Sequence, residues 1–273
     1  MIGSFLNVVI YRLPIMMQRE WRQQCAALEG RDVEAEKPFD LVRPRSACPG
    51  CDRPIKAWEN IPVISWVWLR GKCAGCKNPI SFRYPAVEIL TGILSLMVAW
   101  RFGPTWETLA ALFFTWSLIA LAGIDYDHKL LPDSITLPLL WLGLLLSLFS
   151  QQVDAQVLFI DPQGAIVGAM AGYMSLWTVY QVFKLVTGKE GMGFGDFKLL
   201  GALGAWLGWK LLPLVILLSA VVGAVVGGTL ILFTRHGREN PIPFGPFLAA
   251  AGWVAMMWGD TLTTQYLKLS GIS

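Results

Sequence analysis

A succession of long apolar runs constrains this chain more than any other feature of its sequence. A helix that crosses a bilayer needs about 20 mostly apolar residues, and runs near or above that length occupy 86–102, 106–124, 134–149, 162–186, 197–233 and 246–260. The longest run exceeds one crossing, so we expect it to divide at Gly208-Trp209-Lys210 into a short helix and a long one. With the short apolar stretch 1–10 counted as a crossing, the sequence predicts an all-α polytopic membrane protein of about eight transmembrane helices.

The distribution of Lys and Arg predicts how these helices are oriented. If residues 11–85 lie in the cytoplasm, 19 of the 22 Lys and Arg fall on that side, and only Arg101, Lys210 and Lys268 fall on the other. The positive-inside rule therefore places 11–85 and the alternate loops in the cytoplasm. Charged residues make up only 15% of the chain, against roughly 25% in soluble domains, and the net charge of +3 gives no indication of nucleic-acid binding.

Residues 11–85 form a polar insert between the apolar runs. The chain is therefore expected to have three parts: a first membrane segment at 1–10, a cytoplasmic metal-binding domain at 11–85, and a transmembrane domain at 86–273. In residues 15–29, near the start of the insert, Met17, Trp21, Cys25 and Leu28 recur at helical spacing. This pattern favours an amphipathic helix, which either lies along the membrane surface or packs on the insert itself.

Four cysteines of the insert form two matched C-x-G-C turns, Cys48 with Cys51 and Cys73 with Cys76. We expect the glycine in each turn to allow a backbone conformation that aims both sulfurs at one point. Four thiolates suit a tetrahedral structural zinc site. The alternatives are two disulfides, which a reducing cytoplasm disfavours, or inert buried cysteines.

Two acids stand at the ends of apolar runs, where an ionised group is costly unless it is paired or functional. Asp125 ends one run, and Asp196 begins another within the sequence Gly193-Phe194-Gly195-Asp196. Two carboxylates that share a proton can activate water, with one acting as base and the other donating to a carbonyl. Glycines at 191, 193 and 195 would let an extended substrate lie beside Asp196.

Plainer interpretations of these residues remain open at this point. Asp196 suits the first turn of a helix, and Asp133, after Pro132, suits a helix N-cap. Asp127, His128, Lys129 and Lys198 could be loop charges or phospholipid contacts. The glycine repeats 164/168/172, 204/208 and 223/227 are interpreted as close helix packing and nothing more.

Seven stretches, in order along nearly the whole chain, resemble the bacterial type IV prepilin peptidases, the bifunctional leader peptidase and N-methyltransferase family. They are GSFLNVVIYRLP (3–14), the paired C-x-G-C turns, ENIPVISW (59–66), RYPAVE (83–88), IDYDHKLLPD (124–133), TGKEGMGFGDFKLLGALGAWLGW (187–209) and PIPFGPFLAAAGW (241–253). The family usually carries a full apolar helix before the first stretch, whereas only Met1 and Ile2 precede it here. We therefore expect 1–10 to be an abbreviated or truncated membrane segment.

The resemblance implies an inner-membrane aspartic endopeptidase of the G-x-G-D type. It would cut the basic leader from prepilins and pseudopilins of type IV pili and type II secretion at a Gly–Phe junction. It would then methylate the new N-terminus with S-adenosylmethionine. By resemblance, the catalytic acids are Asp125 and Asp196, and the zinc ligands are Cys48, Cys51, Cys73 and Cys76. Gly193, Gly195 and Lys198 are candidate substrate-binding residues.

No Rossmann glycine pattern in the sequence indicates a binding site for S-adenosylmethionine. Because the protease site uses the other loops, the polar insert is the expected location by elimination. Three other functions fit part of the sequence. A proton-coupled transporter would also carry boundary acids and glycine-rich helices. A zinc-stabilised assembly factor would bind prepilins without cutting them, and a peptidase could lack methyl transfer. Oligomeric state and the choice between pilins and pseudopilins are not indicated.

Overall fold

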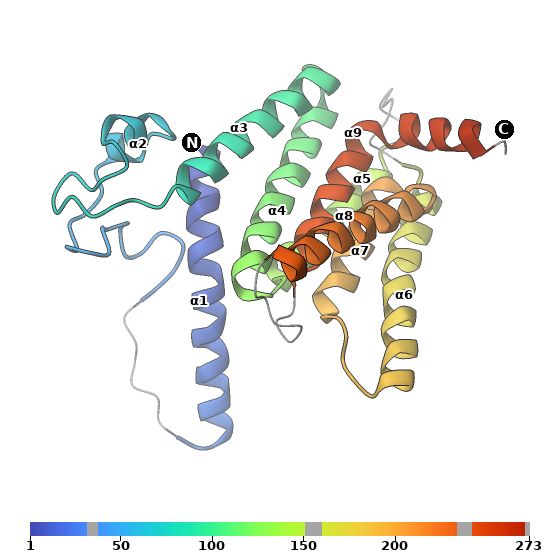
Figure 1. Ribbon diagram of the computed structural model, residues 1–273, viewed down its shortest axis with the longest axis horizontal. Helices are drawn as coiled ribbons and strands as arrows, with labels where there is room; N and C mark the ends of the chain where they lie inside the picture. Colours follow the sequence, from blue (N-terminus) through green and yellow to red (C-terminus); the bar gives the residue numbers. More distant parts are fainter. Residues whose placement is uncertain (32–37, 151–159, 234–241, 271–273) are drawn as a thin grey trace. The chain divides into compact units, whose positions relative to one another are not determined.

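The computed structural model describes residues 1–31, 38–150, 160–233 and 242–270. Over these residues the chain is helical, and it contains two isolated β-bridges but no β-strand (Figure 1). The chain divides into two compact units, Met1–Met97 and Val98–Ser273. The predicted all-α fold is thus confirmed.

In its described residues, the first unit contains two long helices and two short ones. They are α1 (Ile2–Leu28), the 3-10 helix η1 (Ala57–Asn60), α2 (Ile64–Trp68) and most of α3 (Arg83–Phe102). The sequence predicted a membrane segment at 1–10 and a separate amphipathic helix at 15–29, but α1 runs continuously through both and includes Pro14. Its buried residues all lie between Gly3 and Pro14, and its second half contains none.

The second unit is a bundle of six α-helices and one short 3-10 helix within the described residues. They are α4 (Trp106–His128), α5 (Asp133–Ser147), α6 (Pro162–Thr187), α7 (Phe194–Leu207), η2 (Trp209–Leu211), α8 (Leu212–Phe233) and α9 (Gly245–Ser270). The predicted division of 197–233 is confirmed, because α7 ends at Leu207 and Gly208 takes a positive φ of 75° before η2. Trp258 has non-helical backbone angles that interrupt α9, and Figure 1 shows α9 as a bent helix.

Local signals explain where α6 begins and ends. Asp161 caps its first turn, because its carboxylate accepts a hydrogen bond from the backbone N–H of Gly164 at 2.8 Å. Pro162 occupies the first helical position, where a missing N–H costs no helical hydrogen bond. Gly188 ends the helix in the left-handed conformation with φ 68°.

Helix α7 is the centre of the second unit. From Leu199 to Leu207 every residue is buried, as expected of a helix that is apolar on all sides. It packs against α5, α6 and α9. On α6, a Cβ added at Gly168 would overlap the backbone carbonyl of Gly204, and one added at Gly172 would overlap that of Leu200. Backbone therefore meets backbone between these helices, which confirms the packing interpretation for Gly168, Gly172 and Gly204.

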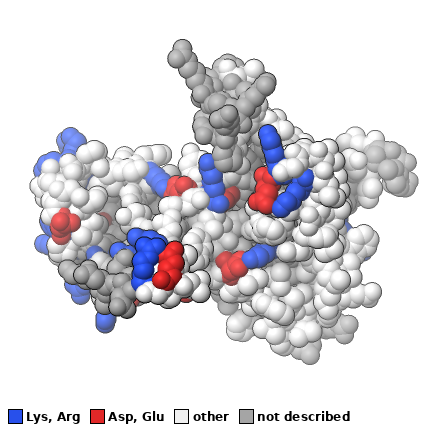
Figure 2. Space-filling view, turned by 90° about the horizontal axis from the view of Figure 1, so that it is seen from below, with Lys and Arg blue, Asp and Glu red and all other residues white. Residues whose placement is uncertain are grey.

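Four helices of the described chain are long and apolar enough to cross a membrane, judged by length and composition. They are Arg83–Phe102, Trp106–His128, Pro162–Thr187 and Trp209–Thr229, and Asp133–Ser147 is a shorter apolar helix. On the face shown in Figure 2, Lys and Arg lie beside Asp and Glu in small groups, and broad areas carry no charged side chain. These features are those of a membrane protein.

Candidate active site and metal centre

Asp125 lies in the last turn of α4, pointing into the helical bundle. It is only 5% exposed, and its backbone carbonyl accepts from the N–H of Lys129, which ends the helix in the left-handed conformation. Its side-chain Oδ2 accepts a hydrogen bond of 2.9 Å from the backbone N–H of Gly245, the first residue of α9. That N–H belongs to the group of helix N-terminal donors that lack intrahelical partners, and a helix N-terminus favours a negative charge.

Asp196 lies in the first turn of α7, where Gly193 precedes the helix as its N-cap residue. Its side chain is buried, and it lies close enough to Asp125 for the two carboxyl groups to repel one another electrostatically. The structure therefore brings together two acids that are 71 positions apart in the sequence. In this arrangement the two carboxyl groups can share one proton.

The glycines beside Asp196 have different surroundings. Gly193 is exposed and extended, with φ −79° and ψ 147°, and a Cβ there would meet only the Asp196 Oδ2 at 3.8 Å. A Cβ at Gly195 would instead lie 2.7 Å from the Cβ of Leu131, and one at Gly191 would lie 2.8 Å from the ring of Phe183. Of these three glycines, Gly193 alone leaves open space beside the acid.

Lys198 is engaged within the protein. Its ammonium donates to both carboxylate oxygens of Asp133 at 2.7 Å, so the ion pair joins α7 to the start of α5. Asp133 is the first residue of α5, and Pro132 occupies the N-cap position. Asp133 is therefore not the N-cap that its sequence context suggested.

Sequence reasoning missed two residues that complete the surroundings of the acids. Gly245 donates to Asp125, and Leu131 is packed against both Gly195 and Gly245. The signal for Gly245 was present in its neighbours, because a glycine beside Pro246 at the start of an apolar run indicates a helix N-terminus.

The four cysteines of the two C-x-G-C turns lie together, and their sulfurs are all within 4.8 Å of one another. They are free thiols, so the structure contains neither of the two possible disulfides. The Sγ atoms of Cys48 and Cys76 are 3.6 Å apart, near the roughly 3.8 Å spacing expected for tetrahedral thiolates around a metal at about 2.3 Å. This cluster can hold a metal ion.

The two turns have matching backbones. The bridge between Ala47 and Pro54 corresponds to that between Lys72 and Pro79. The positive φ values of the two turns occur at Asp52 (52°) and Lys77 (61°), directly after the second cysteine of each turn, and not at the glycines. The glycines provide close approach instead: a Cβ at Gly50 would overlap the side chain of Asn78, and one at Gly75 would lie 3.2 Å from Arg53.

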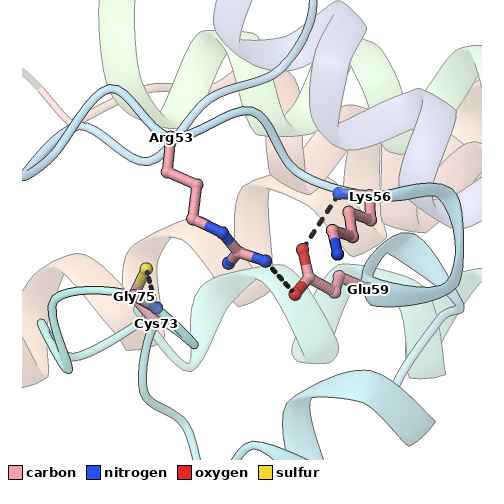
Figure 3. A network of polar contacts seen from close by, with 5 residues as sticks. All are labelled: Arg53, Lys56, Glu59, Cys73 and Gly75. Carbon is pink, nitrogen blue, oxygen red and sulfur yellow. Dashed lines mark hydrogen bonds and ion pairs between the residues drawn. The ribbon is translucent and has the colours of Figure 1, made fainter.

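An ion-pair network supports the cysteine cluster (Figure 3). Arg53 donates to Glu59 at 2.7 Å, and the backbone N–H of Lys56 donates to the other Glu59 oxygen at 2.9 Å. The Lys56 N–H and the Arg53 guanidinium hold the pKa of Glu59 below its usual value. Backbone N–H groups of Cys76 and Gly75, together with the Cys48 thiol, lower the pKa of Cys73 to about 6, which favours the metal-binding thiolate.

Comparison with known proteins matches residues 1–102 to the Bacterial Peptidase A24 N-terminal domain and residues 112–228 to the Type IV leader peptidase family. Three similar relatives are each named prepilin leader peptidase/N-methyltransferase. The relative in Aeromonas hydrophila is 58% identical over 98% of this chain and 90% of its own. The relative in Pseudomonas aeruginosa is 52% identical over 99% and 91%, and that in Legionella pneumophila is 46% identical over 97% and 91%. No solved structure matches the chain.

Proposed function

Because the chain belongs to the type IV leader peptidase family, we propose that it cuts the leader from prepilins and pseudopilins and methylates the new N-terminus. The buried acid pair at the adjoining ends of α4 and α7 carries this proposal, because it supplies the chemistry that peptide hydrolysis requires. The relatives' names favour neither a transporter nor a non-catalytic assembly factor.

Asp125 and Asp196 are the proposed catalytic residues. One ionised carboxylate takes a proton from water while the water oxygen attacks the carbonyl carbon of the Gly–Phe junction. The other carboxyl group, kept protonated by its charged neighbour, donates its proton to the carbonyl oxygen. As the C–N bond of the tetrahedral diol breaks, the leaving amine of Phe takes a proton from one carboxyl group and a hydroxyl group of the diol gives its proton to the other, which restores the singly protonated pair. No acyl-enzyme forms in this sequence.

The exposed, extended backbone at Gly193 is the proposed path for the junction peptide. Its open side adjoins Asp196, so an unwound substrate segment could lie there with its carbonyl near the acid pair. Gly195 contributes indirectly, because it lets Leu131 pack on α7. Lys198 could reach a substrate acid only by exchanging its partner Asp133.

The four cysteines are the proposed ligands of a structural zinc ion. Zn²⁺ suits four thiolates, and four protein ligands leave no position for substrate. Bound zinc would join the two turns through all four thiolates. The Arg53 guanidinium interacts electrostatically with Cys73. It would therefore offset part of the negative charge of four thiolates.

We place methyl transfer in the insert at 11–85, within a three-part organisation of first segment, insert and transmembrane domain. The described chain has no β-strand, so it offers no Rossmann-type site for S-adenosylmethionine. The acid pair and its loops serve peptide cleavage, so the insert is the remaining candidate location for methyl transfer. The excess of Lys and Arg on one side supports a cytoplasmic insert and an inner-membrane location.

Mass spectrometry of a prepilin incubated with the purified protein tests both activities. We expect a product that begins at Phe, with one added methyl group only when S-adenosylmethionine is present. Cleavage without methylation would remove the second activity. An uncut prepilin, with protein whose melting and metal content are normal, would contradict the proposed peptidase.

A further inference from the structure

The short helix α2 presents an apolar face to its surroundings. Ile64, Val67 and Trp68 are 61%, 62% and 83% exposed, and their spacing puts them on one side of the helix. Trp66 points the other way: its indole N–H donates to the carbonyl of Ile80 at 3.2 Å, and its ring lies edge-on to Phe82. We call Ile64, Val67 and Trp68 the exposed α2 face.

Glu88 fixes the position of α2 within the first unit. One of its oxygens accepts from the N–H of Val63, immediately before α2, at 2.8 Å, and the other accepts from the hydroxyl of Ser4. Val63 has φ 61°, a rare conformation for a β-branched residue that persists only where surrounding contacts hold it. The Ser4 hydroxyl also lies 3.3 Å from the carbonyl of Asn60.

These contacts place α2 beside the first turns of a membrane-crossing helix. Helix α3 begins at Arg83, so Glu88 lies five residues into it, about 8 Å along its axis. Asn7 of α1 donates to the carbonyl of Tyr84, while Ser4 reaches Glu88, so α1 and α3 run in opposite directions here. Figure 1 shows α2 and the N-terminus of α1 near the start of α3. The exposed α2 face therefore lies at the level where α3 enters the membrane.

We propose that the exposed α2 face inserts into the boundary between headgroups and acyl chains of the bilayer that α3 crosses, with anionic phospholipid as its partner. Trp favours this boundary, and aliphatic side chains beside it bury apolar area in the acyl region. Exposed Lys56, Arg70 and Lys72 flank this segment and suit anionic headgroups. The polar insert is thereby held against the membrane by its own surface as well as by α1 and α3.

Photocrosslinking from single positions of the full chain tests this proposal. Trp68 is replaced by p-benzoylphenylalanine, which inserts into nearby C–H bonds, and the protein is reconstituted in bilayers of phosphatidylethanolamine and phosphatidylglycerol. The matched control carries the same probe at Val42, which is 79% exposed in the same unit. The loop around Val42 is bound to α1 through Arg12, whose guanidinium donates to the carbonyls of Asp40 and Pro44. Arg12 lies eight residues, or about 12 Å, along α1 from Ser4 and away from the membrane level.

We expect illumination to attach phospholipid to position 68 several-fold more often than to position 42, as measured by the mass of the labelled peptides. Equal lipid attachment at both positions would overturn the proposal. So would attachment at position 68 to a second copy of the chain, or to an added prepilin, in place of lipid. The readout does not require catalysis, so it stands or falls separately from the proposed peptidase.

Discussion

Replacing Gly245 by Ala tests whether α9 positions Asp125 for catalysis. The new Cβ would lie 2.7 Å from the Asp125 Oδ2 and 3.1 Å from its Cγ. Ordinary contact begins near 3.4 Å, so the carboxyl group must withdraw by about 0.7 Å, and its hydrogen bond to the Gly245 N–H is stretched or lost. Gly245 has no positive φ, so the backbone itself accepts alanine without strain.

Two independent estimates give the size of the effect. A hydrogen bond to a charged group is worth about 1.5–3 kcal/mol, which corresponds to roughly 10- to 150-fold in rate at about 1.4 kcal/mol per tenfold. A displacement of about 1 Å in a catalytic group costs on the order of 100-fold. We therefore expect Gly245→Ala to lower kcat for prepilin cleavage by roughly 10- to 100-fold, with KM little changed because the loss concerns the reacting groups.

Initial cleavage rates of a prepilin in reconstituted bilayers measure this effect. Gly228→Ala is the matched control, because nothing lies within 4 Å of a Cβ at Gly228 in α8. Thermal melting and metal content show whether each variant is folded. Cleavage by Gly245→Ala at the rate of Gly228→Ala would refute the reasoning that Asp125 depends on the N-terminus of α9.

Three further results are expected. Gly168→Ile should lower the melting temperature of the solubilised protein, because overpacking against the backbone of α7 costs about 1–3 kcal/mol or more, whereas Gly228→Ala should not; equal melting would contradict the close helix contact. Glu59→Gln should melt below the unchanged protein at pH 7. The pKa of Glu59 is lowered by folding, so ionised Glu59 stabilises the folded protein above its unfolded pKa, and this stabilisation is lost as the pH falls through its folded pKa. The difference in melting temperature between the two proteins should therefore narrow on acidification, and a constant difference would count against the ion-pair network. Cys51→Ser should lose bound zinc in metal analysis while Cys25→Ser keeps it, and retention by both would exclude the four-thiolate site.

Much of this architecture could be predicted because the membrane leaves few choices. Apolar runs must form helices, since the backbone finds no water to bond in lipid. The length of 197–233 required a break, and Gly208-Trp209-Lys210 indicated its position. The cysteine cluster was predictable for a similar reason, because two matched C-x-G-C turns favour four thiolate ligands around one metal ion. The glycines of α6 and α7 indicated close packing, although their sequence does not say which helix each one meets.

Other features depended on contacts between distant segments. The continuity of α1 through Pro14 was missed because the change from apolar to polar residues resembled a boundary between elements. Gly245 donates to Asp125 across 120 positions of sequence, and no local pattern specifies that partner. The pairing of Lys198 with Asp133, 65 positions away, likewise arises from how α5 and α7 pack. Helix positions were readable from the sequence, but the partners of polar side chains at helix ends were not.

The most direct test of the acid pair is cleavage of a prepilin by single variants of each acid. Asp125→Asn and Asp196→Asn keep side-chain size and remove the ionisable group, and Asp127→Asn serves as the control from an exposed position on the same helix. We expect mass spectrometry to find no shortened prepilin with either of the first two variants and a normal product with the third. A normal product from either Asp125→Asn or Asp196→Asn would contradict catalysis by this pair.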